Sequence, residues 1–147
     1  MIAKQIMTTR VHTASPNDLV NKLIHKMAKE GISGLPVVDK NKKLLGIITE
    51  TDIAEHESNP HTPRAISILG GLIYLDDLNS YNETLKKICA QKAKDLMSEN
   101  LVTVDENATL EEIIKTMNSR NLSRLPVTDK KGHLKGIITR TDIIRKL

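Results

Sequence analysis

The sequence of 147 residues contains no phenylalanine or tryptophan, two tyrosines and a single cysteine. One cysteine allows no disulfide within the chain, which is typical of proteins of the reducing cytoplasm. The chain has no run of about 18 apolar residues, which excludes a membrane-spanning helix. Its first residues also lack the apolar core of a secretory signal peptide. We therefore expect a cytoplasmic globular protein without a membrane partner.

Few features of the composition point to catalysis, metal binding or nucleic-acid binding. The net charge is only +4 and the charges of both signs are interleaved, which favours anionic partners weakly. Surfaces that bind nucleic acid normally supply aromatic side chains for stacking, so we expect no nucleic-acid partner. The five histidines show no metal-ligand spacing. No activated nucleophile or acid–base carboxylate pair is evident, so we expect no metal, no catalytic residue and no enzyme.

The chain instead contains an internal repeat with an offset of 90 residues. Residues 46–53, GIITETDI, return as residues 136–143, GIITRTDI. Residues 3–53 align with residues 93–143 without a gap. Such a repeat indicates two copies of one supersecondary unit. A copy of about 55 residues buries little surface alone, so we expect the two copies to pack face to face.

Each copy contains one amphipathic helix. In the first copy, residues 15–18 (SPND) have the composition of a helix start, with Ser15 as the cap. Gly31 ends that helix. In the second copy, Asp105 takes the place of the cap and Asn121 replaces Gly31. The apolar positions with helical spacing are Val20, Leu23, Ile24 and Met27 in the first copy and Leu110, Ile113, Ile114 and Met117 in the second.

Strands and a second helix complete each copy. The Thr-Asp dipeptides at Thr51-Asp52 and Thr141-Asp142 are expected to open that helix. Each copy thus runs strand, helix, strand, strand, helix, an α/β unit of the type β-α-β-β-α. The expected strands lie near residues 11–14, 36–38 and 44–49, and near residues 101–104, 126–128 and 134–139.

The two copies occupy residues 1–57 and 93–147, and residues 58–92 connect them without repeating. This connection is expected to be a loop with short helices, one of them over residues 82–91 carrying Cys89 as a buried apolar residue. A connection of this length and apolar content favours an ordered lid or an interface element over a flexible linker. The sequence leaves open whether it covers a cleft or a dimer interface.

The same chemical groups follow the last strand of both copies. Thr49 and Thr139 end the two Gly-Ile-Ile-Thr strands, and Asp52 and Asp142 follow three residues later. A helix start at this point favours phosphate, to which a threonine hydroxyl donates, whereas a carboxylate accepts from sugar hydroxyls. The pair therefore fits a ribose phosphate. The alternative is structural, with the aspartates capping helices; recurrence in both copies favours binding.

These motifs, in this order and present twice, resemble a tandem pair of cystathionine-β-synthase-type (CBS) domains, a Bateman module. The resemblance includes residues 4–7 and 94–97, the first short strand of each copy, and residues 32–39 and 122–129. It implies a regulatory module that binds an adenine nucleotide in clefts between the copies and forms a homodimer. The ligands it implies are AMP, ADP, ATP, S-adenosylmethionine or cyclic di-AMP, none of them an obligatory cofactor.

The resemblance also implies a role for particular residues. Asp52 and Asp142 would hold ribose hydroxyls, and Thr49 and Thr139 the phosphate. The residues implied around the adenine are Thr13, Ala14, Leu35, Pro36, Thr103, Val104, Leu125 and Pro126. Gly34, Arg124 and Arg140 complete the candidate nucleotide-binding residues, near the phosphate.

The two copies differ near the implied phosphate. The first has Gly34 and Glu50 where the second has Arg124 and Arg140. Arginine adds charge-assisted hydrogen bonds to a phosphate and glutamate repels it. We therefore expect the second copy to bind nucleotide phosphate more tightly, unless positions 50 and 140 point only to solvent. The expected function is an adenylate sensor that modulates an unidentified target protein; the alternative is a ligand-free interaction or dimerisation module.

Overall fold

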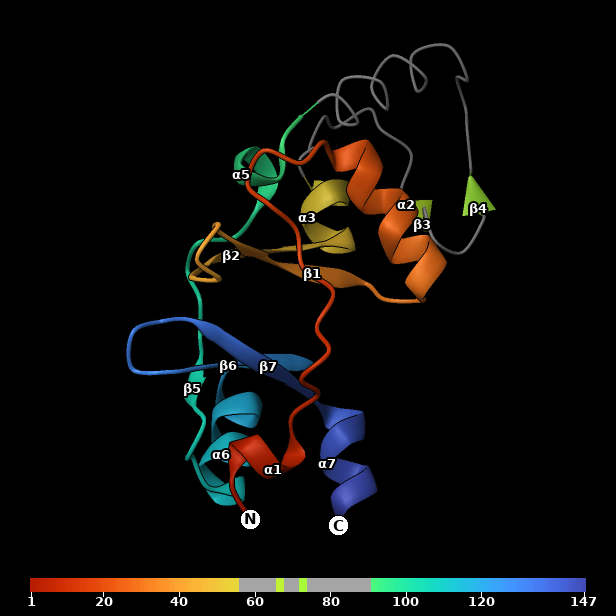
Figure 1. Ribbon diagram of the computed structural model, residues 1–147. Helices are drawn as coiled ribbons and strands as arrows, with labels where there is room; N and C mark the ends of the chain where they lie inside the picture. The colour runs from red at the N-terminus through yellow and green to blue at the C-terminus, as the bar shows by residue number, and fades with distance from the viewer. Residues whose placement is uncertain (56–65, 68–71, 74–90) are drawn as a thin grey trace. The chain divides into compact units, whose positions relative to one another are not determined.

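The computed structural model describes residues 1–55, 66–67, 72–73 and 91–147 (Figure 1). The chain forms two compact units, which we describe separately. Unit C contains residues 1–12, 38–44 and 100–147, and unit N contains residues 13–37 and 45–99. Each unit thus combines most of one repeat with the leading segment of the other. No helix in the described part of the chain is long and apolar enough to cross a membrane.

Unit C has the β-α-β-β-α order expected for a copy. It contains β5 (Val104–Asp105), α6 (Leu110–Ser119), β6 (Arg124–Thr128), β7 (Leu134–Thr139) and α7 (Arg140–Lys146), and α1 (Ala3–Ile6) joins them. The strands form one sheet in the order β5-β6-β7. β5 runs parallel to β6, and β7 runs antiparallel to β6. This topology confirms the predicted strand-helix-strand-strand-helix reading.

Unit N repeats the arrangement with α2 (Val20–Glu30), β1 (Gly34–Val38), β2 (Leu44–Thr49), α3 (Glu50–Glu55) and α5 (Ala93–Leu96). β1 and β2 form a two-stranded sheet. The first strand expected here is reduced to a single parallel bridge between Ala14 and Val37. The two copies are therefore a pseudo-symmetric pair of one α/β fold.

The leading segments are exchanged between the repeats. The main-chain N–H of Ala3 donates to the carbonyl of Ala108 (2.8 Å), and at the matching place Ala93 donates to Asp18 (2.9 Å). Ala3 and Ala93 are both fully buried. α1 therefore packs with the second copy and α5 with the first, although the sequence order places them the other way round.

The glycine that opens each repeated motif makes room for this exchange. A Cβ on Gly136 would lie 2.6 Å from Sδ of Met7 and 2.9 Å from the carbonyl oxygen of Thr8. A Cβ on Gly46 would lie 2.7 Å from Sδ of Met97. Both strands therefore require glycine where the exchanged segment crosses them, because a side chain would overlap its neighbours.

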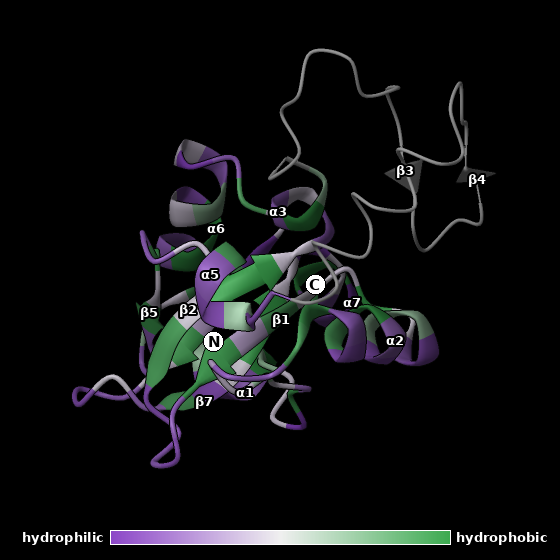
Figure 2. Ribbon diagram, turned by 90° about the horizontal axis from the view of Figure 1, so that it is seen from above, coloured by the Kyte–Doolittle hydropathy of each residue, from purple (hydrophilic) through white to green (hydrophobic). Residues whose placement is uncertain are grey.

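Each unit has its own apolar core. The strands are mostly hydrophobic, whereas α2 and α7 also carry hydrophilic residues (Figure 2). The apolar stripes predicted for α2 and α6 supply Leu23 and Met27 to one core and Ile113 and Met117 to the other. The remaining buried core residues are Ala14, Val20, Leu35, Val37, Ile48, Ile53, Ala93 and Leu96 in unit N, and Ala3, Ile6, Leu125, Val127, Ile138 and Ile143 in unit C.

The predicted start of the first helix is wrong. α2 begins at Val20, and Ser15 lies in a separate turn in which its main-chain N–H donates to Oδ2 of Asp18 (2.9 Å). Leu19 is extended and forms a β-bridge with Lys92. A partner distant in sequence therefore holds the chain extended at Leu19, and the helix begins at Val20 instead of directly after Ser15.

The predicted cap of the second helix is also wrong. Thr109 caps α6 by accepting from the main-chain N–H of Glu112, whose side chain accepts in return from Thr109. The Thr109 N–H lowers the pKa of Glu112. Asp105 instead lies in β5 and accepts from the N–H of Asn107 (2.9 Å). A Thr-x-x-Glu capping box outcompetes the earlier aspartate.

The helix ends agree with the prediction. Gly31 follows α2 with φ of +64°, and Asn121 follows α6 with φ of +50°. Both lie in the left-handed region that favours glycine and, after it, asparagine.

The connection between the repeats contains one strand pair that the sequence does not predict. β3 (Ile66–Ser67) and β4 (Leu72–Ile73) pair antiparallel. The expected helix over residues 82–91, Cys89 and most of the expected loop lie outside the described residues.

Candidate functional site

In unit C, the candidate site is a closed hydrogen-bonded ring between the end of β7 and the start of α7. The main-chain N–H and the hydroxyl of Thr139 both donate to Oδ2 of Asp142, at 2.8 and 2.7 Å. The N–H of Asp142 donates back to the Thr139 hydroxyl at 3.2 Å. This is a capping box, so the structural role considered for the pair is real. Both residues are half-buried, and Oδ1 of Asp142 takes no part in the ring.

In unit N, the same ring joins the end of β2 to the start of α3. Thr49 donates to Oδ2 of Asp52 from its N–H (2.8 Å) and its hydroxyl (3.0 Å), and accepts from the Asp52 N–H (3.3 Å). In addition, the hydroxyl of Ser98 donates to Oδ1 of Asp52 at 3.0 Å. Both oxygens of Asp52 are therefore engaged within the protein, whereas the Asp142 ring uses only one.

Two arginines lie beside the ring of unit C. Arg124 is the register partner of Thr139 in the β6–β7 ladder, which places the two residues directly opposite each other. Arg140 follows Thr139 in the chain, is exposed, and donates from Nε to the carbonyl of Leu122 (3.0 Å). Nε alone anchors the side chain in this contact, so the two terminal nitrogens of the guanidinium take no part in it. Two cationic residues are thus neighbours of Thr139, one across the ladder and one along the chain.

The corresponding positions of unit N carry no cation. Gly34 begins β1, and the exposed Glu50 follows Thr49. A different cation lies elsewhere in this unit: Nζ of Lys26 donates to the carbonyl of Thr13 at 2.6 Å. The candidate residue Thr13 is therefore bonded to a lysine for which the second copy has Thr116.

The other candidate residues are mostly built into the sheets. The N–H of Ala14 donates to the carbonyl of Pro36 (2.8 Å), and Val104 pairs with Val127 beside Pro126. Thr103 is exposed. The prolines and their neighbours Leu35 and Leu125 are buried, so they can offer a ligand main-chain groups or edges only. All candidates of the first copy lie in unit N, and all of the second lie in unit C.

The described residues contain no group of three or more His, Cys, Asp or Glu side chains that could hold a metal ion. The polar groups at the candidate site are hydroxyls, carboxylates and, in unit C, guanidinium groups. Such a set recognises sugar hydroxyls and phosphate oxygens by hydrogen bonding and charge.

Comparison with known sequences identifies the family. Residues 3–59 and 93–147 match the CBS domain. The chain belongs to the CBS domain family. Its two CBS repeats include both Thr–Asp rings and both exchanged segments.

Among relatives, the chain is 32% identical over 154 residues to the uncharacterized protein MJ1426 of Methanocaldococcus jannaschii, covering 100% of this chain and 91% of that protein. It is also 31% identical over 144 residues to the inosine-5'-monophosphate dehydrogenase of the same organism. That match covers 98% of this chain but only 23% of the dehydrogenase. The chain therefore resembles a part of that enzyme.

Solved CBS-pair structures share the fold. The structure of CBSX2 in complex with AMP superposes with a TM-score of 0.74 at 24% identity, covering 99% of this chain and 94% of that one. The CBS domain pair of protein MJ0100, in complex with 5'-methylthioadenosine and S-adenosyl-L-methionine, gives 0.71 at 25% identity, with 99% and 94% covered. Both neighbours hold adenosine-containing ligands.

The sequence did not reveal the roles of Ser98 and Lys26 in the CBS repeats. Ser98 and Asp52 are 46 positions apart, and Lys26 and Thr13 are 13 apart. The available signal was the difference between copies, because the repeat places Thr8 at the position of Ser98 and Thr116 at that of Lys26.

Proposed function

We propose that this CBS-pair protein binds an adenine nucleotide, or a related adenosyl ligand, and thereby regulates a target protein without catalysing a reaction itself. The observation that carries the proposal is the Thr–Asp ring, which both copies form with the same three hydrogen bonds. A helix cap alone needs no aspartate here, since the capping box of α6 uses glutamate. Retention of Thr and Asp at both places therefore supports a further role.

The chemistry of the ring in unit C suits a ribose phosphate. Oδ1 of Asp142 lies outside the ring and is able to accept from a sugar hydroxyl. Arg124 lies opposite Thr139 in the ladder and Arg140 follows it in the chain, and their guanidinium groups carry the charge that a phosphate requires. We therefore propose that the unit C ring binds nucleotide phosphate more tightly than the unit N ring, where Ser98 occupies Oδ1 of Asp52.

The ligand class is supported by relatives. The CBS pair of MJ0100 holds 5'-methylthioadenosine and S-adenosyl-L-methionine, and CBSX2 holds AMP. AMP, ADP, ATP, S-adenosylmethionine and cyclic di-AMP are therefore the ligands to test. The candidate residues in and beside the strands would contact the base through main-chain groups and apolar edges. They are Thr13, Ala14, Leu35, Pro36, Thr103, Val104, Leu125 and Pro126.

Regulation would follow from linkage. A ligand shifts a conformational equilibrium only if it binds one conformation more tightly than another. We propose that the protein acts as a homodimer in the cytoplasm, and that nucleotide binding alters the surface offered to the target protein.

The test is a thermal-shift screen of nucleotide-free protein with these five ligands, and with GTP as a control for the base. A ligand at about 100 times its dissociation constant adds roughly 2.7 kcal/mol, which raises the melting temperature by about 5 °C or more. Asp142→Asn should abolish most of the shift, whereas the matched variant Asp52→Asn should retain most of it.

The ligand-free alternative makes the opposite prediction. If the rings only cap helices, no adenine ligand raises the melting temperature, and the two Asn variants differ from the parent only in stability. The module would then act through protein contacts alone.

A further inference from the structure

A second feature of unit C lies at the opposite end of its strands. The turn between β1 and β2 pairs with the turn between β6 and β7, although they are 90 residues apart. The N–H of Leu44 donates to the carbonyl of Gly132 (3.0 Å), and the N–H of Leu134 donates to the carbonyl of Lys42 (2.9 Å). We call residues 39–43 and 129–135 together the lysine ridge.

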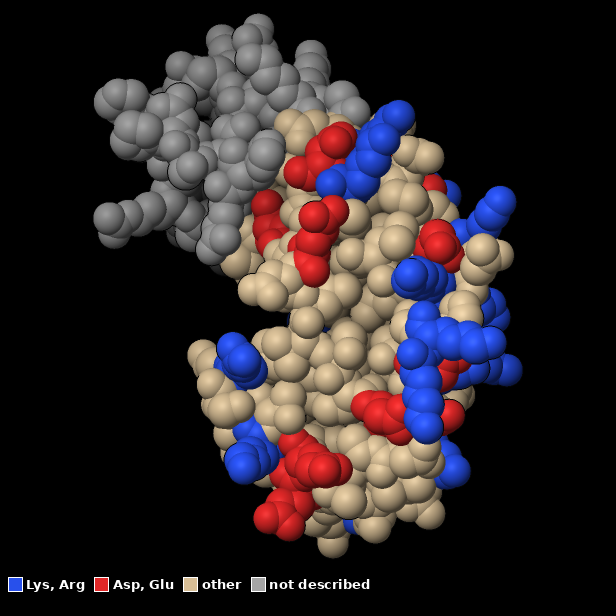
Figure 3. Space-filling model, turned by 90° about the vertical axis from the view of Figure 1, so that its left-hand side faces the viewer, with Lys and Arg blue, Asp and Glu red and all other residues tan. Residues whose placement is uncertain are grey.

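The ridge concentrates positive charge. It contains six lysines and two aspartates, so it carries an excess of four positive charges, equal to the net charge of the entire chain. The remainder of the chain is therefore neutral on balance. Basic side chains gather on the side of the molecule toward which both turns project (Figures 1 and 3). All the ridge lysines are exposed: Lys40, Lys42, Lys43, Lys130, Lys131 and Lys135.

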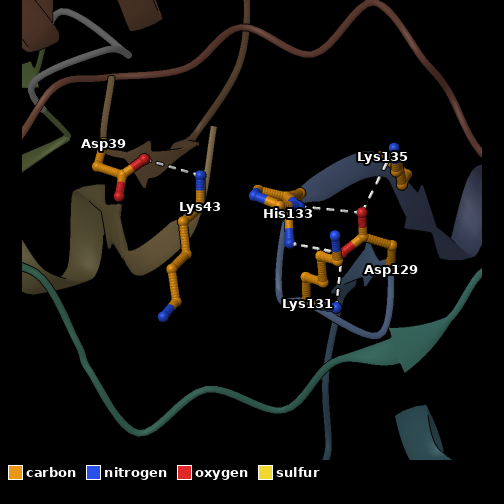
Figure 4. A network of polar contacts seen from close by, with 6 residues as sticks. All are labelled: Asp39, Lys43, Asp129, Lys131, His133 and Lys135. Carbon is orange, nitrogen blue, oxygen red and sulfur yellow. Dashed lines mark hydrogen bonds and ion pairs between the residues drawn. The ribbon is translucent and has the colours of Figure 1, made fainter. Parts of the chain in front are cut away.

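The aspartates of the ridge mainly hold the turns. Oδ1 of Asp39 accepts from the main-chain N–H groups of Asn41 (2.8 Å) and Lys43 (2.9 Å). Oδ1 of Asp129 accepts from the N–H groups of Lys131 and His133, each at 2.9 Å (Figure 4). These bonds position the backbone, and the two carboxylates offset only two of the six lysine charges.

Only one ridge lysine has an acidic partner within the part of the chain that the structure describes. Nζ of Lys135 lies 3.5 Å from Oδ2 of Asp129, which also contacts Nδ1 of His133 at 3.1 Å. The ammonium groups of the other five make no ion pair with a described carboxylate. The two turns are bonded to each other, and the positive charges that they carry repel one another. An anionic partner that offsets these charges would therefore be attracted to the ridge.

The backbone conformation at position 42 favours glycine over lysine. Lys42 has φ of +64°, a conformation that a lysine adopts at a cost and that its counterpart Gly132 adopts freely at φ of +84°. The stem of Lys43 runs past Gly132, since a Cβ added at Gly132 would lie 3.8 and 3.9 Å from Cε and Cγ of Lys43. The fold thus accepts a strained lysine at position 42 and packs another against the paired turn.

We propose that the lysine ridge is a docking surface for an Asp/Glu-rich segment of a partner protein. The ridge contains no arginine, phenylalanine, tyrosine or tryptophan. Its one aromatic ring, the half-buried imidazole of His133, contacts Asp129, so the ridge offers few of the groups that stack on nucleic-acid bases. Lysine ammonium groups are mobile point charges on flexible stems, and they suit a row of carboxylates more than one planar anion. The charge complementarity is with an acidic peptide.

This surface is separate from the nucleotide site proposed above. β7 begins at Leu134, in the ridge, and ends at Thr139, in the Thr–Asp ring. Six strand residues span roughly 16 Å. The proposal therefore does not rest on nucleotide binding, and the two are measured independently.

The test is fluorescence anisotropy of a labelled poly-Glu peptide with the full chain. The triple variant Lys40→Gln, Lys43→Gln, Lys131→Gln should weaken binding about tenfold, as expected for the loss of three exposed charge contacts. The control removes the same charge elsewhere, with Lys29→Gln, Lys94→Gln and Lys115→Gln on three helices. It should change affinity by less than about twofold, and added salt should weaken binding of the parent protein.

A second measurement locates the peptide. Amide NMR signals of residues 40–43 and 130–135 should shift on titration with poly-Glu, and those of the control lysines should not. Absence of binding, an equal loss in the two triple variants, or shifts elsewhere would overturn the proposal. Tighter binding of a single-stranded oligonucleotide than of poly-Glu would also overturn it, and would assign the ridge to nucleic acid.

Discussion

The two CBS repeats form the same Thr–Asp ring in different surroundings. In unit N, both oxygens of Asp52 are engaged, because Ser98 donates to the second one, and Glu50 adds negative charge beside Thr49. In unit C, Asp142 uses one oxygen in its ring, and Arg124 lies opposite Thr139. The repeat therefore preserves the geometry of the ring, while its electrostatics are set by neighbours that differ between copies. This difference underlies our proposal that unit C binds phosphate more tightly.

The exchange of leading segments is, by contrast, nearly identical in the two units. α1 and α5 begin with equivalent hydrogen bonds, and equivalent glycines lie under Met7 and Met97. The positions of the exchange are thus repeated closely, whereas positions 34 and 50, beside the first Thr–Asp ring, differ from positions 124 and 140 beside the second. Substitutions at equivalent positions of the two copies test this difference, at the two glycines and at positions 50 and 140.

The largest effect is expected where the exchanged segment crosses the strand. Gly136→Ala should lower the free energy of unfolding by about 1–3 kcal/mol, because the new methyl group overlaps Met7 and the carbonyl of Thr8. Gly46→Ala should cost slightly less, since its nearest atoms are about 0.1 Å farther away. Urea denaturation measures both. If Gly136→Ala is as stable as the parent, then Met7 and Thr8 move away from position 136 at little cost, and the glycine is not required there.

A moderate effect is expected from the charges beside the two rings. Arg140→Ala should weaken AMP binding about tenfold, which corresponds to about 1.4 kcal/mol, by removing a charge-assisted contact to phosphate. Adenosine is the control ligand, because it lacks the phosphate and its affinity should not change. Glu50→Arg should strengthen AMP binding in unit N. Isothermal titration calorimetry measures both affinities. Equal AMP affinity for Arg140→Ala and the parent would show that Arg140 does not contact the phosphate.

The smallest effect is expected in the turn of the second copy. The main-chain N–H of His133 is the largest cause that lowers the pKa of Asp129, from 3.8 to about 2. Between these values the unfolded chain binds a proton that the folded chain does not, so stability falls as the pH decreases from about 4 to about 2. Asp129→Asn should remove this part of the pH dependence. Unfolding measured from pH 2 to 6 in both proteins checks it, and parallel curves would contradict the assignment.

Much of the local structure could be predicted from the sequence. The strands Leu44–Thr49 and Leu134–Thr139 have the predicted bounds, and the left-handed residues Gly31 and Asn121 end their helices as expected. These features depend on hydrophobic alternation and on backbone conformations that neighbouring residues determine. The starts of α2 and α6 were harder, because a distant β-bridge at Leu19 and a stronger cap at Thr109 compete with the nearer signals.

The sequence predicted which types of residue form the candidate site, whereas the tertiary structure determined what surrounds them. The offset of 90 residues identified Thr49, Asp52 and their counterparts, yet nothing local relates Ser98 to Asp52. That distant contact decides whether one or both carboxylate oxygens of the aspartate accept hydrogen bonds within the protein. The proposed preference of phosphate for the ring of unit C therefore rests on a sequence difference at positions 50 and 140 and on a contact that only folding creates.

By itself, then, the sequence determined the repeat, the order of elements in each copy, the family and the chemical groups at each strand end, because these depend on residue identity and short-range spacing. Only the tertiary structure decided that the leading segments are exchanged, that Ser98 bonds to Asp52, and that two turns 90 residues apart form one lysine ridge. Each of these is a contact between segments distant in the chain. Such contacts form when packing and hydrogen bonding offset the entropy of closing a long loop, and local sequence patterns do not encode that balance.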